Sequence, residues 1–392
     1  MAKNLWDSTV ADIDAAVTEK TKAEAGEEHF LRARKPWNIA QSHKEMDVTI
    51  EDLLSDEYYL GRFKTWPSVV EELCQIWHMR CDFNVRFYNN RKVLKQDTVY
   101  ALSHEHAVRR ASEKWPRIAK DADLVRVWRD HNVHTVVLEL PKGTGKDYEI
   151  SLCIWLLTRE FLIMDREEFF DPYELDMETT VSITLMNRSE EQAKKVTFSE
   201  ILSRFDVPFF RDYFPPQIDF DIMSDARRFP SELRFPKNVV IFPGTGSAAS
   251  GLGYCIGASV IDEANFLQKT DSGKRSILGA DGYDAAAEAY ADLIQRQESR
   301  FGALREGIMC YAGLTFIISS SRTRNDFTQQ MKARSINDPG IFYVCKPFWD
   351  RKPLALSGET FKFDLNSMTV VDLEGSREKY KKVTTIEGIE AE

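Results

Sequence analysis

The stretch His134–Asp147 constrains the fold of this chain more than any other part of the sequence. It reads HTVVLELPKGTGKD, and it leads into a second apolar run, Ile150–Met164. A β-branched apolar run, two glycines, a lysine and a long apolar segment predict a strand, a loop and a helix, which is the context of a phosphate-binding loop. Glycines let backbone N–H groups turn towards a ligand, and the helix N-terminus adds a partial positive charge.

The loop fits the phosphate-binding pattern G-x-x-x-x-G-K-[ST] only in part. Gly145 and Lys146 match, but Leu140 stands at the position of the first glycine and Asp147 at that of the Ser or Thr. On these residues alone, a phosphate-binding loop and a glycine-rich turn that carries a lysine are equally good interpretations. The choice depends on what the rest of the chain supplies.

Composition limits the class of protein. The 392 residues are 43% hydrophobic and 29% charged, which is typical of a globular protein with two domains or one large α/β core. No apolar run reaches the ~18–20 residues of a membrane span, and the N-terminus lacks the pattern of a signal peptide. We therefore expect no membrane association and a cytosolic location.

Charge bears on possible partners. The formal net charge is −10, so contact with DNA would need local basic patches and would depend strongly on salt. Candidate patches are Arg109–Arg110, Arg227–Arg228 and Lys274–Arg275, although most charge clusters are solvated surface.

The sequence before the loop contains two segments that differ in composition and in hydrophobic pattern. Residues 1–50 are polar and predict a loosely ordered arm, whereas residues 51–130 predict a helical N-terminal region with helices at Ser103–Trp115 and Asp121–Arg129. Aromatic side chains recur in this region. Most such aromatics form core, and stacking on an adenine is the alternative for one of them. They are Trp66, Trp77, Phe83, Phe87, Trp115 and Trp128.

The P-loop ATPase core is expected over residues 131–340. Apolar runs predict further strands at Thr180–Met186, Val239–Phe242 and Leu314–Ile318. Residues 341–392 contain only short apolar pieces, and we expect them to form a small lid and a linker.

An acidic pair ends another apolar run. Cys255–Asn265 reads CIGASVIDEAN, so Asp262 and Glu263 stand where a buried strand would end. Carboxylates there are costly unless a positive partner lies beside them, and nucleotide-bound Mg²⁺ is such a partner. In a P-loop enzyme the aspartate holds the metal and the glutamate activates the attacking water. The alternative is a strand that ends in ordinary solvated acids.

A third strand tip is also polar. Leu314–Ile318 is followed by Ser319, Ser320, Ser321 and Arg322. Small hydroxyl groups on a neighbouring strand tip can bond the γ-phosphate or the water, whereas a serine-rich turn is an equally good interpretation of this segment alone.

Taken together, the lysine-bearing loop, the strand ending in IDEANF, the later RQESRF and the tip SSSRTRNDF resemble the ATPase domain of the large terminase subunit of tailed bacteriophages. The resemblance spans about residues 50–365. It implies an α/β fold of the additional-strand P-loop NTPase class, with a mostly parallel central sheet flanked by helices, a helical N-terminal region and a small lid.

The resemblance also implies roles for individual residues. Asp262 would organise Mg²⁺ and Glu263 would be the catalytic carboxylate. Lys146 would hold the ATP phosphates and contribute to catalysis. The other residues expected to contact the nucleotide are Lys142, Gly143, Thr144, Gly145, Asp147, Ser320 and Ser321.

Three departures from the terminase pattern stand out. Asp147 replaces the hydroxyl residue that ligates Mg²⁺; its carboxylate can also bind metal, but it brings negative charge close to the phosphates. The loop GTGSAASGLG lacks the arginine that many relatives carry there, and Arg300 is our preferred substitute over Arg296, Arg322 or Arg324. Relatives usually continue into a nuclease domain, and we expect no nuclease activity from this chain.

The function implied by the resemblance is ATP-driven translocation of double-stranded viral DNA into a procapsid. The implied partners are the portal protein, the small terminase subunit and further copies of the chain in a ring, expected to be a pentamer, in the cytoplasm of an infected host bacterium. Two rival functions are a helicase-like P-loop ATPase on other nucleic acid and a non-hydrolysing nucleotide-binding assembly protein. The acidic pair argues against the second rival, and Asp147 argues for it.

Overall fold

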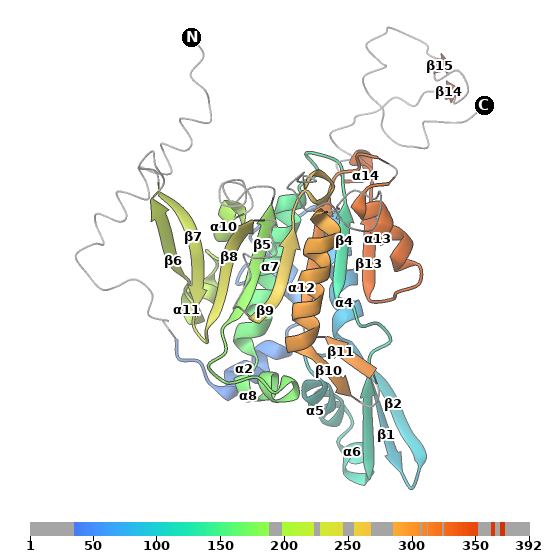
Figure 1. Ribbon diagram of the computed structural model, residues 1–392. Helices are drawn as coiled ribbons and strands as arrows, with labels where there is room; N and C mark the ends of the chain where they lie inside the picture. The colour runs from blue at the N-terminus through green and yellow to red at the C-terminus, as the bar shows by residue number, and fades with distance from the viewer. Residues whose placement is uncertain are drawn as a thin grey trace, which may run out of the picture.

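The computed structural model describes residues 35–187, 198–222, 228–245, 255–267, 285–305, 308–311, 313–323, 325–351, 362–364 and 369–372. Its centre is an eight-stranded sheet of order β13-β4-β12-β9-β5-β8-β7-β6 (Figure 1). The strands are β4 (Thr135–Glu139), β5 (Val181–Asn187), β6 (Gln217–Ile222), β7 (Arg228–Phe235), β8 (Val239–Thr245), β9 (Cys255–Ile261), β12 (Leu314–Ser319) and β13 (Ile341–Cys345).

The direction of the strands confirms the predicted fold class. Neighbouring strands from β13 to β8 are all parallel, whereas β7 and β6 are antiparallel. β12 is inserted between β4, which leads into the glycine loop, and β9, which ends at the acidic pair. This insertion is the arrangement of an additional-strand P-loop NTPase. It brings the carboxyl ends of all three strands to one edge, where ligands bind in open α/β sheets.

Helices cover both faces of the sheet. Successive side chains of a strand point to opposite faces, so Val136 and Leu138 belong to one hydrophobic cluster and Val137 to another. The first face carries α7 (Lys146–Ile163), and the second carries α12 (Ala285–Phe301) and α13 (Phe327–Ser335) (Figure 1). Strands buried on both faces read as continuous apolar runs, which is why the sequence revealed them.

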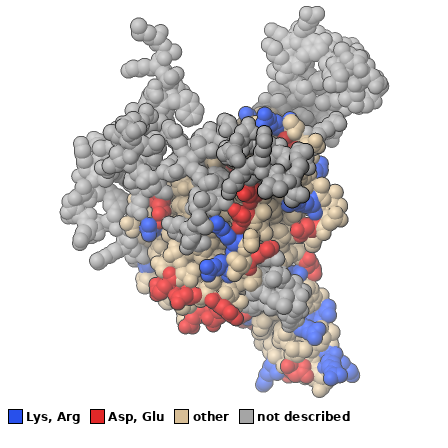
Figure 2. Space-filling model, viewed as in Figure 1, with Lys and Arg blue, Asp and Glu red and all other residues tan. Residues whose placement is uncertain are grey.

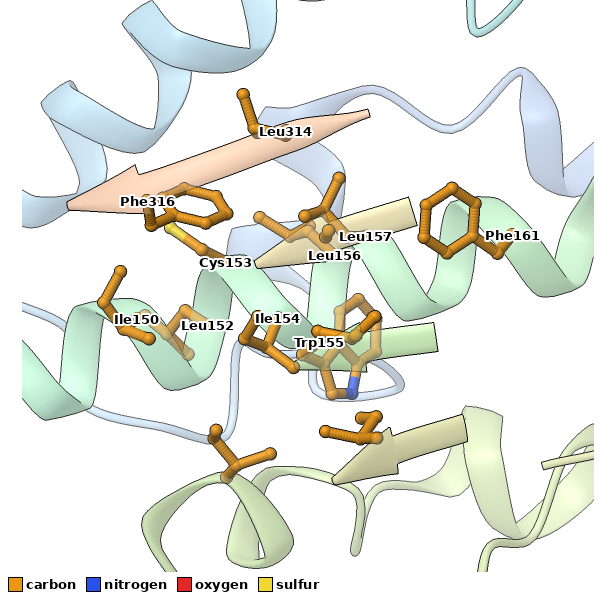
Figure 3. Close-up of a cluster of buried hydrophobic side chains, with 14 of the residues drawn as sticks. Ile150, Leu152, Cys153, Ile154, Trp155, Leu156, Leu157, Phe161, Leu314 and Phe316 are labelled. Carbon is orange, nitrogen blue, oxygen red and sulfur yellow. The ribbon is translucent and has the colours of Figure 1, made fainter. Parts of the chain in front are cut away.

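The helix after the glycine loop is the centre of the first face. Every α7 residue from Glu149 to Ile163 is buried. Figure 3 shows its apolar side chains beside Leu314 and Phe316 of β12. Its late charges are paired internally: Arg159 bonds the Glu45 carboxylate at 2.8 Å, and Glu160 accepts from the Trp77 indole at 2.6 Å.

The N-terminal region is helical only in part. It contains α2 (Ile39–Met46), α3 (Ile50–Ser55), α4 (Pro67–Cys81), α5 (His104–Lys114) and α6 (Pro116–Asp121), but also a three-stranded antiparallel sheet of order β2-β1-β3. The strands are β1 (Asp82–Asn89), β2 (Lys92–Tyr100) and β3 (Leu124–Trp128). The helix predicted at Asp121–Arg129 is therefore wrong. Val125 and Val127 alternate with outward residues, and this period of two suits a strand paired with β1.

The C-terminal segment also differs from the prediction. β13, expected in a lid, is an edge strand of the central sheet and pairs in parallel with β4. The helix α14 (Phe348–Arg351) follows it, and β14 (Lys362–Asp364) pairs with β15 (Thr369–Asp372). The domain boundaries and the lid remain predictions.

Shorter elements complete the described chain. They are α8 (Arg166–Phe170), η1 (Asp171–Tyr173), α10 (Ser199–Arg204), α11 (Pro208–Tyr213), η4 (Ala264–Phe266), β10 (Gly302–Arg305) and β11 (Ile308–Tyr311). Across the described ranges, no helix is both long and apolar enough to cross a membrane.

A buried ionic cluster joins α14 to the core. Arg351, whose side chain is fully buried, donates to Glu72 of α4 and, at 2.7 Å, to Glu149 in the first turn of α7. Lys346 lies 3.1 Å from the second oxygen of Glu72. Burial raises the pKa of Glu149 to about 8, although the charge of Arg351 lowers it and that of Glu72 raises it further. The cluster therefore ties the C-terminal segment to the helix that begins at the glycine loop.

Candidate functional site

The glycine loop has the backbone geometry that its sequence predicts. Gly143 and Gly145 adopt positive φ angles of 77° and 79°, a conformation that favours glycine, and α7 begins at Lys146. The Thr144 hydroxyl donates to the Pro141 carbonyl at 2.6 Å and closes the turn. The loop thus leads directly into a helix N-terminus, as an anion-binding loop requires.

Trp66 packs against this loop. A Cβ atom built on Gly145 would lie 2.4 Å from Cζ3 of the Trp66 ring, so only glycine fits there. Trp66 immediately precedes α4, and its ring centroid lies 6.3 Å from that of Tyr148 in the first turn of α7. Of the aromatics singled out in the N-terminal region, it is therefore Trp66 that reaches the candidate nucleotide loop.

The lysine of the loop contacts the tip of β12. The Lys146 ammonium donates to the Ser320 hydroxyl at 2.9 Å, and Ser320 is only 6% exposed. Ser321, by contrast, donates to the carboxylate of Glu139. The structure therefore brings Ser320 to the lysine of the glycine loop and directs Ser321 to the end of β4.

Glu139 is a component of this region that the sequence analysis did not identify. It is 1% exposed and accepts hydrogen bonds from Gln329 at 2.7 Å and from the Tyr343 hydroxyl at 2.8 Å, besides that from Ser321. Burial acts to raise the pKa of Glu139, but these hydrogen bonds, with one from Thr328, hold it below its ordinary value. The sequence feature that could have identified Glu139 is its charge within the otherwise apolar run VVLEL. Glu139 holds the β12 tip in place beside the loop.

The acidic pair lies at the end of β9, as predicted. Asp262 is 5% exposed, and its two oxygens accept from the Asn187 amide and from the Glu263 N–H, both at 2.8 Å. Glu263 has a φ of 51° and is partly exposed. The chain thus turns sharply after the strand, with one carboxylate buried and held and the next more accessible.

Asn265 connects the acidic pair to the β12 tip. Its backbone N–H donates to the Ser319 hydroxyl at 3.0 Å, and its side-chain amide donates to the Ser320 carbonyl at 3.0 Å and to the Thr328 hydroxyl at 2.8 Å. Sequence reasoning missed this residue, because an asparagine after two acids carries no distinctive pattern. The loop, the acidic pair and the serine tip are consequently joined through hydrogen bonds.

The carboxylates at this edge of the sheet suit a Mg²⁺ ion that is bound together with a nucleotide. Among the described residues, no group of three His, Cys, Asp or Glu side chains lies close enough to hold a metal ion alone. A magnesium ion takes one or two carboxylates and completes its shell with phosphate oxygens and water. Asp262 fits such a ligand, because the Asn187 amide and the Glu263 N–H hold its carboxylate in place at the end of β9.

Asp147, the second predicted metal ligand, lies in an acidic environment. Burial raises its pKa; Glu200 and Glu263 raise it further, and Lys146 lowers it. The carboxylate form of Asp147 is therefore less favoured here than that of a free aspartate. Its role as a metal ligand stays a prediction.

Replacing Asp147 with Thr is expected to tighten the binding of Mg·ATP by about tenfold, or about 1.4 kcal/mol. The change removes a destabilised negative charge near the phosphates and supplies the hydroxyl that the loop pattern contains. Isothermal titration calorimetry would measure the affinity. The Asp147→Asn variant removes the charge without adding a hydroxyl. Its affinity for Mg·ATP should lie between those of the original protein and of the Asp147→Thr variant. Weaker binding by both variants would instead identify the Asp147 carboxylate as a metal ligand.

The arginines expected near the site lie in different places. Arg300 is at the end of α12, where its charge acts on the thiol of Cys255 at the start of β9; burial raises the pKa of that thiol to about 11. Arg300 is thus at the opposite end of β9 from the acidic pair, away from the loop of its own chain. Arg322 does lie at the site, because its guanidinium and the Lys142 ammonium contact the Phe266 ring at 5.6 and 5.2 Å. Arg324 is outside the described residues.

The chain matches one protein-family model. That model describes the N-terminal P-loop domain of the uncharacterized protein MJ0330, and it matches residues 86–380. The curated proteins include no match to the chain.

Several solved structures are similar to part of the chain. The large terminase of a thermophilic bacteriophage, in complex with ADP, is 9% identical, with a TM-score of 0.33 over 58% of this chain and 43% of that one. The HK97 bacteriophage large terminase is 16% identical, with a TM-score of 0.31 over 54% and 35%. The large terminase ATPase domain of Thermus phage P74-26 is 13% identical, with a TM-score of 0.30 over 58% and 80%. The chain thus spans less than half of the first two of these proteins.

The family assignment rests on the family model and on the fold. The model covers about three quarters of the sequence, and the glycine loop, the inserted strand and the parallel sheet have the geometry of a P-loop domain. The chain belongs to the family defined by the N-terminal P-loop domain of MJ0330.

Proposed function

We propose that this chain binds Mg·ATP between the glycine loop and the acidic pair and hydrolyses it to translocate double-stranded viral DNA, as the ATPase domain of a terminase large subunit. One observation carries the ATPase part of the proposal. Lys146 bonds the Ser320 hydroxyl, while Asn265, next to the acidic pair, bonds the Ser320 carbonyl. A phosphate-binding lysine, an acidic strand end and a polar strand tip therefore meet at one edge of the sheet.

Each group has a role in this proposal. Lys146 and the N-terminal N–H groups of α7 bind the phosphates. Asp262 would hold Mg²⁺, which supplies positive charge to the phosphates when it is bound with ATP. Glu263 orients and deprotonates the attacking water, and it is accessible enough to reach a bound water. Ser320 responds to the phosphate because its hydroxyl already accepts a hydrogen bond from Lys146, the residue that the phosphate would contact.

Motif resemblance supports the DNA-translocation part of the proposal. IDEANF, RQESRF and SSSRTRNDF resemble segments of terminase ATPase domains. In this proposal the chain assembles as a ring of five copies, with the portal protein and the small subunit as partners. Arg300, which lies away from its own loop, completes the site of a neighbouring copy.

A second candidate function is a nucleotide-binding assembly protein that does not hydrolyse ATP. Asp147 favours it, because partial burial and the charges of Glu200 and Glu263 raise the pKa of its carboxyl, which indicates a poor environment for further negative charge. The accessible Glu263 favours hydrolysis. The two functions differ in turnover, not in fold.

Turnover assays with different nucleic acids test the proposal. The purified chain should hydrolyse ATP in a Mg²⁺-dependent reaction that double-stranded DNA stimulates more than RNA does. The Lys146→Ala variant should lose ATP binding, since it removes the charge that stands at the end of the loop, within reach of the β- and γ-phosphates. ATP binding without turnover in any condition would favour the assembly protein, and stronger stimulation by RNA would favour a helicase-like ATPase.

A further inference from the structure

The small antiparallel sheet of the N-terminal region has one covered face and one open face. Phe83, Val85 and Phe87 of β1 are buried under α5 and α6. The opposite surface, which we call the outer face, includes Leu124 and Val93, exposed by 47% and 54%. By alternation and register, the outer face consists of Asn84, Arg86, Tyr88, Val93, Gln96, Thr98, Leu124, Arg126 and Trp128.

Two arginines stand directly opposite each other on the outer face. Arg86 of β1 is in register with Arg126 of β3. Like charges at directly opposed positions destabilise a sheet. Within the described part of the chain, no carboxylate lies within ion-pair distance of either guanidinium. This arrangement is unfavourable for the isolated protein, and an anion bound between the two arginines would relieve it.

Aromatic rings hold both arginines in place. The Arg86 guanidinium lies 4.9 Å from the Trp128 ring centroid, and that of Arg126 lies 5.7 Å from the Tyr88 ring centroid. Arg86 also donates from Nε to Gln96 at 2.8 Å. The Arg86 Nη2 also donates to Gln96, and its Nη1 donates to the Tyr88 hydroxyl at 3.3 Å, so with the Nε bond three of its five N–H groups are used within the sheet. These bonds fix the Arg86 guanidinium, and its two remaining N–H groups, with those of Arg126, can meet a phosphate; pre-ordering lowers the entropy lost on binding.

The charge around the outer face favours an anionic partner. None of its nine residues is acidic. Arg91 and Lys92 extend it at the β1–β2 turn, where both are exposed. Residues 82–128 carry ten Lys and Arg and six Asp and Glu, a net charge of +4 in a chain of −10. Figure 2 shows Lys and Arg grouped at the lower end of the molecule, where Figure 1 places this sheet.

The basic clusters named from sequence do not supply this surface. Arg109 and Arg110 contact Asp47 at 3.3 and 3.6 Å, and Arg110 also donates to the Tyr100 carbonyl. They serve contacts within the protein. The other two clusters fall wholly or partly outside the described residues.

We propose that the outer face binds a nucleic acid strand, with Arg86 and Arg126 on its phosphates and the Tyr88 and Trp128 rings beneath them. Paired guanidinium groups match phosphate oxygens, and a sheet face that carries arginines and aromatics can also stack bases. An acidic protein would satisfy the charges but would not use the aromatic platform. The inference extends the proposed function by placing a nucleic-acid contact, and it does not depend on ATP hydrolysis.

Fluorescence anisotropy with the full chain, without nucleotide, tests this inference. The probes are a labelled DNA duplex, a single strand of the same length and labelled polyglutamate. Arg86→Glu with Arg126→Glu should weaken nucleic-acid binding about tenfold or more, and should lower the slope of log affinity against log salt by about two. The matched control is Arg117→Glu with Lys120→Glu on α6, which makes the same charge change at exposed sites off the outer face and should leave affinity within about threefold.

Arg126→Gln gives a second test, because Arg126 is exposed and the substitution leaves the strand pairing intact. It should weaken binding severalfold while the melting temperature stays the same or rises. Equal losses from the outer-face variant and the control would overturn the inference, since they indicate general charge attraction. Tighter binding of polyglutamate than of either nucleic acid would also overturn it in favour of an acidic protein. Because no nucleotide is present, a failure of ATP hydrolysis leaves these results interpretable.

Discussion

The Glu263→Gln variant is expected to bind ATP as tightly as the original protein and to hydrolyse it about 100-fold more slowly, or slower still. Glutamine retains the size of the side chain, so the turn after β9 and the neighbouring Asp262 are preserved. It cannot accept the proton of the attacking water. Calorimetry would measure ATP binding, and phosphate release would measure turnover. The two measurements separate a slower chemical step from weaker nucleotide binding.

Glu200→Gln is the matched control for this experiment. Glu200 is also a carboxylate whose charge reaches Asp147, but it belongs to α10 and not to the acidic strand end. Its turnover should stay within about threefold of the original, too small a change for the loss of a general base. Near-normal turnover by the Glu263 variant would show that another group activates the water.

The Arg351→Met variant is expected to lose about 3–5 kcal/mol of stability. Arg351 is the cation between Glu72 and Glu149, and the side chains of all three are at most 1% exposed. Its removal leaves buried carboxylates without their partner, and such a charge costs far more than a surface ion pair. Because the pKa of Glu149 is about 8, urea unfolding at pH 9, where this carboxyl is ionised in the original protein, would measure the difference in the free energy of unfolding.

Two further variants make the Arg351 result specific. Lys346→Met removes a cation that also contacts Glu72 but is 28% exposed, so we expect a loss of about 1 kcal/mol or less. Adding Glu149→Gln to Arg351→Met should recover part of the stability, because it removes one of the stranded charges. A loss as small as that of Lys346→Met would mean that the carboxylates are already protonated or solvated.

The sequence predicted most of the central sheet because its strands are buried on both faces. Apolar runs such as the one ending at Leu138 identify a strand without any knowledge of its neighbours. The loop was predictable because positive φ at Gly143 and Gly145 is a local requirement. The convergence of the acidic pair and the serine tip followed from the shared edge at which parallel strands end.

What the sequence did not reveal depends on contacts between distant residues. The place of β13 beside β4 is decided by pairing across some 200 residues, and the Arg351–Glu72 pair joins residues 279 positions apart. No local pattern encodes either. The β3 error has another cause: five residues are too few to separate a period of two from a helical period, and the preceding helices favoured the wrong assignment.

The hydrogen bond between Lys146 and Ser320 makes nucleotide binding an exchange of partners. A phosphate that takes the ammonium competes with the serine, so part of its attraction is used in displacing an existing bond. The displaced tip also holds Glu139 through Ser321 and Asn265 through the Ser320 carbonyl. Arrival or loss of a phosphate would therefore affect the contacts of β4 and of the segment after β9 together. This edge of the sheet would then have two hydrogen-bonding arrangements, one with a phosphate and one without.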